Sequence, residues 1–261
     1  MKIRKVLEGQ FYGLTKFKNK WFVFHKNNDN GEILSFSLKE DRIISVQKKV
    51  MGLSPGCHQI DFCSDKLHVI DTYNNCIQVY ASKEEKIIKI EEFYPFGSLE
   101  NGRNSENYVH MNSIWKKDDF FYLFLHNETM KTGKKSEIAI LNDKYKVVKR
   151  HSTEAVNGHN ILKFKGDFVY CNSNENSLVA DNKSVFQADL FTRGLALSSK
   201  YILVGGSQYG ERSLRKNLSG KVYVLNHNFG LLHVLNIPGM VQEIRIVEPM
   251  DHCLSNSMSL H

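Results

Sequence analysis

The chain has 261 residues, 41% of them hydrophobic, and an excess of Lys and Arg over Asp and Glu gives a net charge of +7. This length suffices for one large all-β domain, and no Pro-, Gly- or Ser-rich linker divides residues 1–261. No segment approaches the run of about 18 apolar residues that a membrane span requires, and the N-terminus lacks the apolar run of a signal peptide. We therefore expect a single domain in the cytoplasm, with no membrane partner.

The five cysteines are odd in number and show no CxxC spacing. Because no export signal precedes them, we expect reduced thiols that pack as small buried hydrophobic side chains rather than disulfides.

The predicted strands recur as units along the chain. In the first unit, the motif Tyr12-Gly13-Leu14 precedes apolar strands at residues 21–24, 33–36 and 43–46. In the second, strands are predicted at 58–63, 67–71, 76–80 and 87–90, and the Asn-rich link 72–75 between two of them is typical of a turn. Strands joined by tight turns form a meander, which is the unit of a β-propeller blade.

Three further units follow the same pattern, each opened by a short motif: His110-Met111-Asn112, His159-Asn160-Ile161 and Arg193-Gly194-Leu195. Their later strands are predicted at residues 120–125, 138–141 and 146–149, then 168–170, 177–180 and 185–188, then 201–204, 222–225 and 232–235. The repeat length of about 35 to 55 residues is typical of blades with variable loops.

The sequence therefore predicts an all-β propeller of four-stranded antiparallel blades. Residues 3–7 and 241–247 resemble further strands, which would pack at the seam of the ring. We favour five blades; the alternative is a degenerate sixth blade that combines both termini with residues 253–257.

Residues 67–80, LHVIDTYNNCIQVY, resemble an NHL-type propeller repeat. The resemblance implies the same ring architecture over nearly the whole chain. That class includes scaffolds, RNA binders and enzymes, so the resemblance does not by itself give a function.

Three histidines occupy equivalent positions, at the start of the innermost strand in successive units: His58, His110 and His159. The symmetry of a propeller would point all three imidazoles at the central axis. Imidazole nitrogens suit Zn, Fe or Mn, and three protein ligands leave positions open for water or substrate. We expect a divalent metal site; the alternative is three unrelated polar residues hydrogen-bonded in a wet channel.

Two residues near the same axis are candidates for catalysis. Arg193 occupies the fourth equivalent position, where a cation would suit an anionic group of the substrate. Glu243 follows the last strand-starting motif and is expected to act as a further ligand or a proton-transfer group.

Two long loops are candidates for substrate binding. The loop 205–220 carries Ser207, Arg212 and Arg215, and the loop 93–109 carries Arg103. Arginine forks recognise carboxylate and phosphate groups, so these side chains are expected to hold an anionic part of the ligand.

The first functional hypothesis is a propeller enzyme with a small polar or anionic substrate at the channel mouth. Some enzymes with NHL-like propellers hold a catalytic metal, including the lyase that cleaves peptidyl hydroxyglycine, and this resemblance implies a metal-dependent lyase or hydrolase. The alternative is a non-enzymatic propeller whose rim loops bind a protein, glycan or nucleic acid. The basic residues fall mostly in turns and outer strands without interleaved aromatic residues, so we expect a solvated surface rather than a nucleic-acid site.

Overall fold

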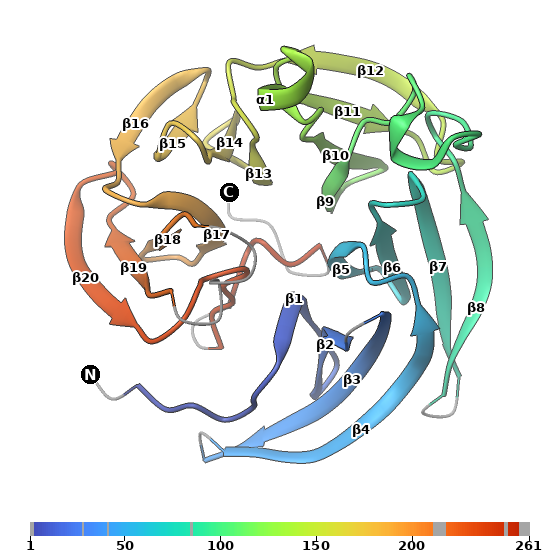
Figure 1. Cartoon of the computed structure of the whole chain (residues 1–261). Coiled ribbons are helices and arrows are strands. Elements are labelled where there is room, and N and C mark those ends of the chain that lie inside the picture. The colour runs from blue at the N-terminus through green and yellow to red at the C-terminus, as the bar shows by residue number, and fades with distance from the viewer. Residues whose placement is uncertain are drawn as a thin grey trace.

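The computed structural model describes residues 3–27, 29–40, 42–83, 86–210, 218–247 and 250–255. In these residues, five four-stranded antiparallel sheets stand around a central axis as the blades of a ring (Figure 1). Within the described residues, helix is confined to α1 (Thr129–Thr132) and one 3-10 turn (Gly102–Asn104). The predicted five-bladed β-propeller is therefore confirmed. No helix in the described part of the chain is long and apolar enough to cross a membrane.

Each blade is made of four strands that follow one another in the sequence, from the innermost strand to the outermost. Blades 1 and 2 contain β1 (Gln10–Phe17), β2 (Lys20–Asn27), β3 (Asn30–Lys39), β4 (Arg42–Leu53), β5 (Cys57–Cys63), β6 (Lys66–Asp71), β7 (Cys76–Lys83) and β8 (Lys86–Phe93). Blades 3 and 4 contain β9 (Met111–Lys117), β10 (Phe120–Leu125), β11 (Glu137–Leu141), β12 (Val147–Ser152), β13 (His159–Phe164), β14 (Asp167–Asn172), β15 (Ser177–Ala180) and β16 (Lys183–Gln187). Blade 5 contains β17 (Phe191–Leu197), β18 (Ile202–Ser207), β19 (Gly220–Leu225) and β20 (Leu231–Ile237).

The prediction of two further strands at the seam was wrong. Residues 3–7 and 241–247 form no strand, and the five blades are complete without them. The sixth-blade alternative fails for the same reason, although residues 256–257 lie outside the described part of the chain. The apolar pattern of residues 241–247 does not come from a strand. This segment leaves blade 5 and enters the central channel (Figure 1).

The core lies between neighbouring blades. Aromatic and branched side chains of inner strands fill these spaces; for example, Phe62 of β5 stacks on Phe17 of β1 with ring centroids 4.4 Å apart. All five cysteines are buried and free, as the sequence predicted. His68 of β6 is also buried, and its Nε2 accepts a hydrogen bond of 2.7 Å from the hydroxyl of Tyr145.

Antiparallel pairing decides which residues meet at each end of the channel. The start of a blade's first strand lies beside the end of its second strand, as in the pairs Cys57–Asp71, Met111–Leu125 and His159–Cys171. The loops that precede the first strands also lie at this end. We call this end of the channel the upper mouth.

Candidate functional site

Four histidines lie ring against ring at the upper mouth. His58 is edge-on to His110 with centroids 4.9 Å apart, His110 stacks on His126 at 4.4 Å, and His126 is edge-on to His159 at 5.3 Å. The repeated strand-starting motifs did not select His126. Its place follows from antiparallel pairing, because its backbone N–H donates to the carbonyl of His110 over 3.1 Å.

His110 has two different ring nitrogens. Nδ1 lies 3.3 Å from the carboxylate of Glu128 and 3.2 Å from the hydroxyl of Tyr108. Nε2 is buried and has no hydrogen-bond partner among the described residues. A proton on Nδ1 would be donated to Glu128, and this tautomer leaves the lone pair of Nε2 available.

The backbone around this pair is strained. His110 has a φ of 49°, and Asn127 and Glu128 have φ values of 56° and 47°, all in the left-handed region. Such a conformation is uncommon for non-glycine residues and costs free energy, and it is found more often at functional sites than elsewhere. The histidine and the residue whose carboxylate contacts it therefore both have a left-handed backbone.

Three of these imidazoles, those of His110, His126 and His159, are held in the neutral form. Burial lowers the pKa of His110, and it lowers the pKa of His126 and His159 much further. The positive charge of Arg193 adds to this lowering of the pKa at all three rings. Only the carboxylate of Glu128 acts in the opposite direction, on the pKa of His110. At neutral pH these rings can therefore accept a proton or a hydrogen bond.

The positive charges of two guanidinium groups act on the pKa of His110 in this cluster. Arg193 of β17 stands over the ring of Tyr12 at 5.7 Å, and Arg103 stands over the ring of Tyr73 at 4.3 Å. Both charges lower the pKa of His110. The charges of Arg103, predicted from a loop, and of Arg193, predicted at the start of an innermost strand, therefore both reach His110.

An aromatic path runs from the cluster to the surface of blade 5. The ring of Phe191 lies edge-on to His159 at 5.7 Å, and Tyr209 lies 5.6 Å from Phe191. Tyr209 is 74% exposed. Sequence reasoning did not select either aromatic residue.

Glu243 lies inside the channel rather than among the histidines. Its carboxylate pairs with the guanidinium of Arg245 at 2.8 Å, and the two side chains are only 7% and 2% exposed. Gln59 and Asn160, which directly follow His58 and His159, point their amides at the same carboxylate from 3.5 and 3.3 Å. Burial raises the pKa of Glu243, while the charge of Arg245 acts against that rise.

The other predicted substrate-binding residues are placed as follows. Ser207 is buried, and its hydroxyl bonds both the N–H and the carbonyl of Val241, at 2.8 and 3.2 Å. Arg212 and Arg215 lie outside the described residues, so their predicted role stays a prediction.

No group of three or more His, Cys, Asp or Glu side chains in the described part of the chain is placed to hold a metal ion. His126, which contacts both His110 and His159, accounts for this, because the rings meet through their faces and edges. The donor chemistry nevertheless suits a metal. His110 and His159 each have Nδ1 beside an oxygen, from Glu128 and from Ser173 at 2.8 Å, which is typical of metal-ligating histidines.

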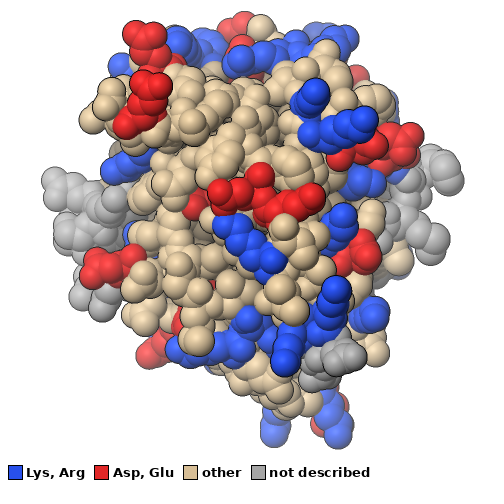
Figure 2. All heavy atoms as spheres, turned by 90° about the vertical axis from the view of Figure 1, so that its right-hand side faces the viewer, with Lys and Arg blue, Asp and Glu red and all other residues tan. Residues whose placement is uncertain are grey.

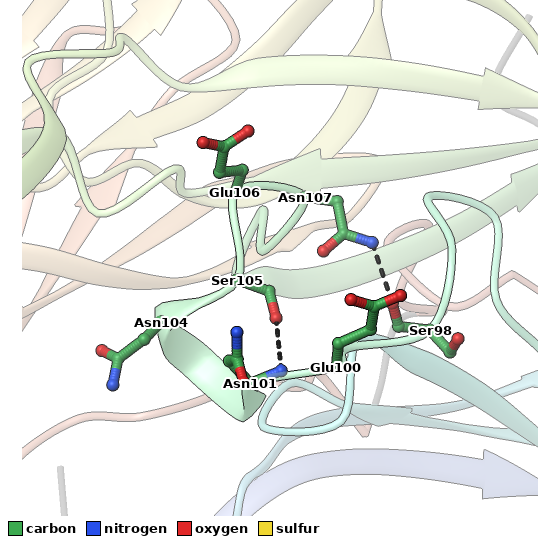
Figure 3. A pocket seen from close by; sticks show the side chains of 7 residues that line it. All are labelled: Ser98, Glu100, Asn101, Asn104, Ser105, Glu106 and Asn107. Atoms are coloured by element: carbon green, nitrogen blue, oxygen red, sulfur yellow. Dashed lines mark hydrogen bonds between the residues drawn. The ribbon is translucent and has the colours of Figure 1, made fainter.

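A polar hollow lies in the loop before β9, outside the histidine cluster. It has a volume of about 610 Å³ and is lined by polar side chains, among them Glu100, Asn104 and Glu106 (Figure 3). Its wall is held by a hydrogen bond of 2.9 Å from the N–H of Asn101 to the hydroxyl of Ser105. The same loop carries Arg103, so it supplies one of the two guanidinium groups near His110.

Charge on the outer surface is mixed. Figure 2 shows Lys and Arg interspersed with Asp and Glu over the side of the ring formed by blades 2 and 3. A nucleic-acid site would be expected to show a continuous basic stripe.

Comparison with known proteins supports the propeller fold but assigns the chain to no family. No model of a protein family matches the chain, and no curated protein matches it. Among solved structures, a putative gluconolactonase superposes with a TM-score of 0.64 at 9% identity, over 92% of this chain and 82% of that one. A chain of the nidogen/laminin complex gives 0.60 at 9% identity over 86% and 79%, and a luciferin-regenerating enzyme gives 0.58 at 8% over 90% and 79%. At these identities the likeness shows a shared propeller architecture only. The resemblance of residues 67–80 to an NHL-type repeat therefore extends to architecture, without support from a family match.

Proposed function

We propose that the upper mouth is the active site of a hydrolase that acts on a small ester or lactone carrying an anionic group. The observation that carries the proposal is the state of His110, a neutral imidazole with one nitrogen held by a carboxylate and the other buried without a partner among the described residues. A base oriented by a carboxylate is the arrangement that general-base catalysis requires.

His110 would take a proton from water through Nε2. Glu128, at Nδ1, would fix the tautomer and stabilise the imidazolium that forms. The depressed pKa of His110 keeps this base neutral as the pH falls below its ordinary value near 6.5. The water would then add to the carbonyl carbon of the substrate, and the proton on His110 would pass to the departing oxygen.

Arg193 and Arg103 would select the anionic substrate. Both charges act on His110, so an anion bound by either guanidinium would lie within electrostatic range of the base. A guanidinium can pair with a carboxylate or phosphate through two parallel hydrogen bonds, and it also stabilises negative charge that develops on a carbonyl oxygen.

The choice of a lactone or ester rests on analogy in fold. Similar propellers include the putative gluconolactonase and a putative 6-phosphogluconolactonase, which superposes with a TM-score of 0.51 at 11% identity over 84% of this chain and 68% of that one. Opening such a ring by water needs a base and an anion-binding group, and the upper mouth offers both. A lyase would use the same base to remove a proton from its substrate instead.

A divalent metal is the alternative to a base at the same site, because an Nε2 of His110 that ligates a metal cannot also accept a proton. His58, His110 and His159 would hold it, since neutral imidazoles are the form that binds metals. When bound, the metal would polarise a substrate oxygen or lower the pKa of a water molecule.

The test measures acid release from glucono-δ-lactone and its 6-phosphate by purified protein, with and without added zinc or manganese. His110→Gln should lower kcat/KM by about a hundredfold or more, because general-base catalysis contributes at least that factor. Glu128→Gln should move the acid limb of the pH–rate profile to lower pH, since Glu128 raises the pKa of His110. Arg193→Ala should raise KM for the phosphorylated lactone more than for the neutral one.

The matched control is His233→Gln, which changes an exposed histidine on β20 and should leave all rates unchanged. Equal rates for wild-type protein and His110→Gln would refute the role of this base. No hydrolysis of either lactone by the wild-type protein, with or without metal, would refute the proposed activity.

A further inference from the structure

The ring is not closed by a shared blade. Every sheet consists of four consecutive strands, so no terminal strand completes a blade at the other end of the chain. Inner strands pack against one another in the order β1, β5, β9, β13, β17, and no comparable contact joins β17 to β1 in the described residues. Between these two strands the described residues show the cation–π contact of Arg193 with Tyr12, so we expect another element to contribute to holding blades 1 and 5 together.

Residues 241–247 and 250–255, which we call the channel segment, begin in contact with blade 5. Ser207 bonds both backbone groups of Val241. Gly205 leaves the space for this residue, because a Cβ atom there would lie 2.5 Å from Cγ1 of Val241.

The middle of the channel segment fills the channel with a buried ion pair. Glu243 and Arg245 pair with each other, and Arg245 also donates to the carbonyl of Leu195 in blade 5 over 3.4 Å. The amides of Gln59 and Asn160 reach Glu243 from blades 2 and 4. The hollow that remains beside Arg245 measures about 10 Å³, which is room for about one water molecule.

The end of the channel segment forms hydrogen bonds to blade 5 and, across the channel, to blades 2 and 3. The backbone N–H of His252 donates to the carbonyl of Leu197 over 2.7 Å. The N–H of Ser255 donates to Asp61 of blade 2 over 3.0 Å, and its hydroxyl accepts from the N–H of Lys116 of blade 3 over 2.8 Å. Asp61 in turn accepts from the hydroxyl of Thr15 of blade 1 over 2.6 Å.

From these contacts we propose that the channel is a binding site for the chain's own C-terminal segment, which closes the ring in place of a shared blade. Its bonds reach blades 2, 3, 4 and 5 directly and blade 1 through Asp61. The charges of Glu243 and Arg245 are compensated by each other, by the channel walls and, for Arg245, also by Asp251 of the same segment, so the segment and the closed ring stabilise each other.

The test uses the full chain with the recognition sequence of a site-specific protease inserted after the exposed Pro238. After folding and cleavage, the C-terminal peptide should co-elute with the ring at micromolar concentration. Its release in mild urea should lower the melting temperature of the ring and open the seam between blades 1 and 5 to trypsin. Arg245→Met, which leaves Glu243 buried without its partner, should speed release about a hundredfold or more.

Ser207→Ala provides a second variant in case Arg245→Met does not fold, and it should also speed release of the peptide. The control is Glu92→Gln, which removes an exposed ion pair with Lys89 and should leave release unchanged. If the peptide leaves the cleaved ring and the melting temperature stays the same, the proposal is wrong. Release at the wild-type rate from both Arg245→Met and Ser207→Ala would also overturn it. Both readouts are independent of any hydrolytic activity.

Discussion

His68 should make the protein labile to acid, and replacing it should remove a measurable part of that lability. The ring of His68 is buried, its Nδ1–H donates to the carbonyl of Lys66 over 3.0 Å, and its Nε2 accepts from Tyr145. Burial, as the largest cause, lowers the pKa of His68 from 6.5 to about 4. The pKa of His68 is lower in the folded state than in the unfolded chain. The contribution of the neutral ring to the unfolding free energy is therefore fully present above pH 6.5 and is lost as the pH falls toward 4.

The magnitude follows from linkage. Each pKa unit corresponds to 1.36 kcal/mol, so a change from 6.5 to about 4 corresponds to about 3 kcal/mol of unfolding free energy. That is a large share of the roughly 5–15 kcal/mol that stabilises a typical domain. Burial lowers the pKa of His110, His126 and His159 in the same direction, so they add to the loss.

Urea unfolding at pH 7, 5.5 and 4 measures the effect. His68→Gln does not titrate in this range, so its unfolding free energy should fall less with acid than that of wild-type protein, by about 3 kcal/mol between pH 7 and 4. His233→Gln, at an exposed position, should follow the wild-type curve. Parallel curves for wild-type protein and His68→Gln would show that His68 is not held neutral, and the reasoning from burial would fail.

Three further outcomes are expected. Protein purified without a histidine tag should gain thermal stability with added zinc or manganese, and His159→Ala should abolish that gain while His233→Ala should not; no shift in wild-type protein would refute the metal site. Arg212→Ala with Arg215→Ala should weaken inhibition by gluconate 6-phosphate about ten- to a hundredfold, because charge-assisted contacts contribute about 1.5–3 kcal/mol, and unchanged inhibition would remove the loop 205–220 from the ligand site. Binding to RNA or DNA should be negligible at about 0.15 M salt, and tight binding that falls steeply with added salt would instead favour a nucleic-acid function.

The sequence determined the propeller fold and favoured the five blades that the structure has. Apolar strands joined by turn residues recur in five units, and each unit can bury its faces only against neighbouring units, which leads to a ring. It also determined that His58, His110 and His159 lie at one end of the channel, because equivalent positions in a propeller share a height along the axis. Even the irregular strand β15 (Ser177–Ala180) was found from its place in the repeat.

Only the tertiary structure decided how these groups meet. His126 enters the cluster because an antiparallel partner lies beside His110, and a scan for repeated motifs does not detect cross-strand neighbours. Residues 241–247 carry the apolar pattern of a strand, yet they fill the channel, because five complete blades leave no inner position for them. For the same reason Glu243 meets Arg245, Gln59 and Asn160 instead of the histidines. Local pattern specifies which residues are apolar or charged, and the closed ring specifies which of them become neighbours.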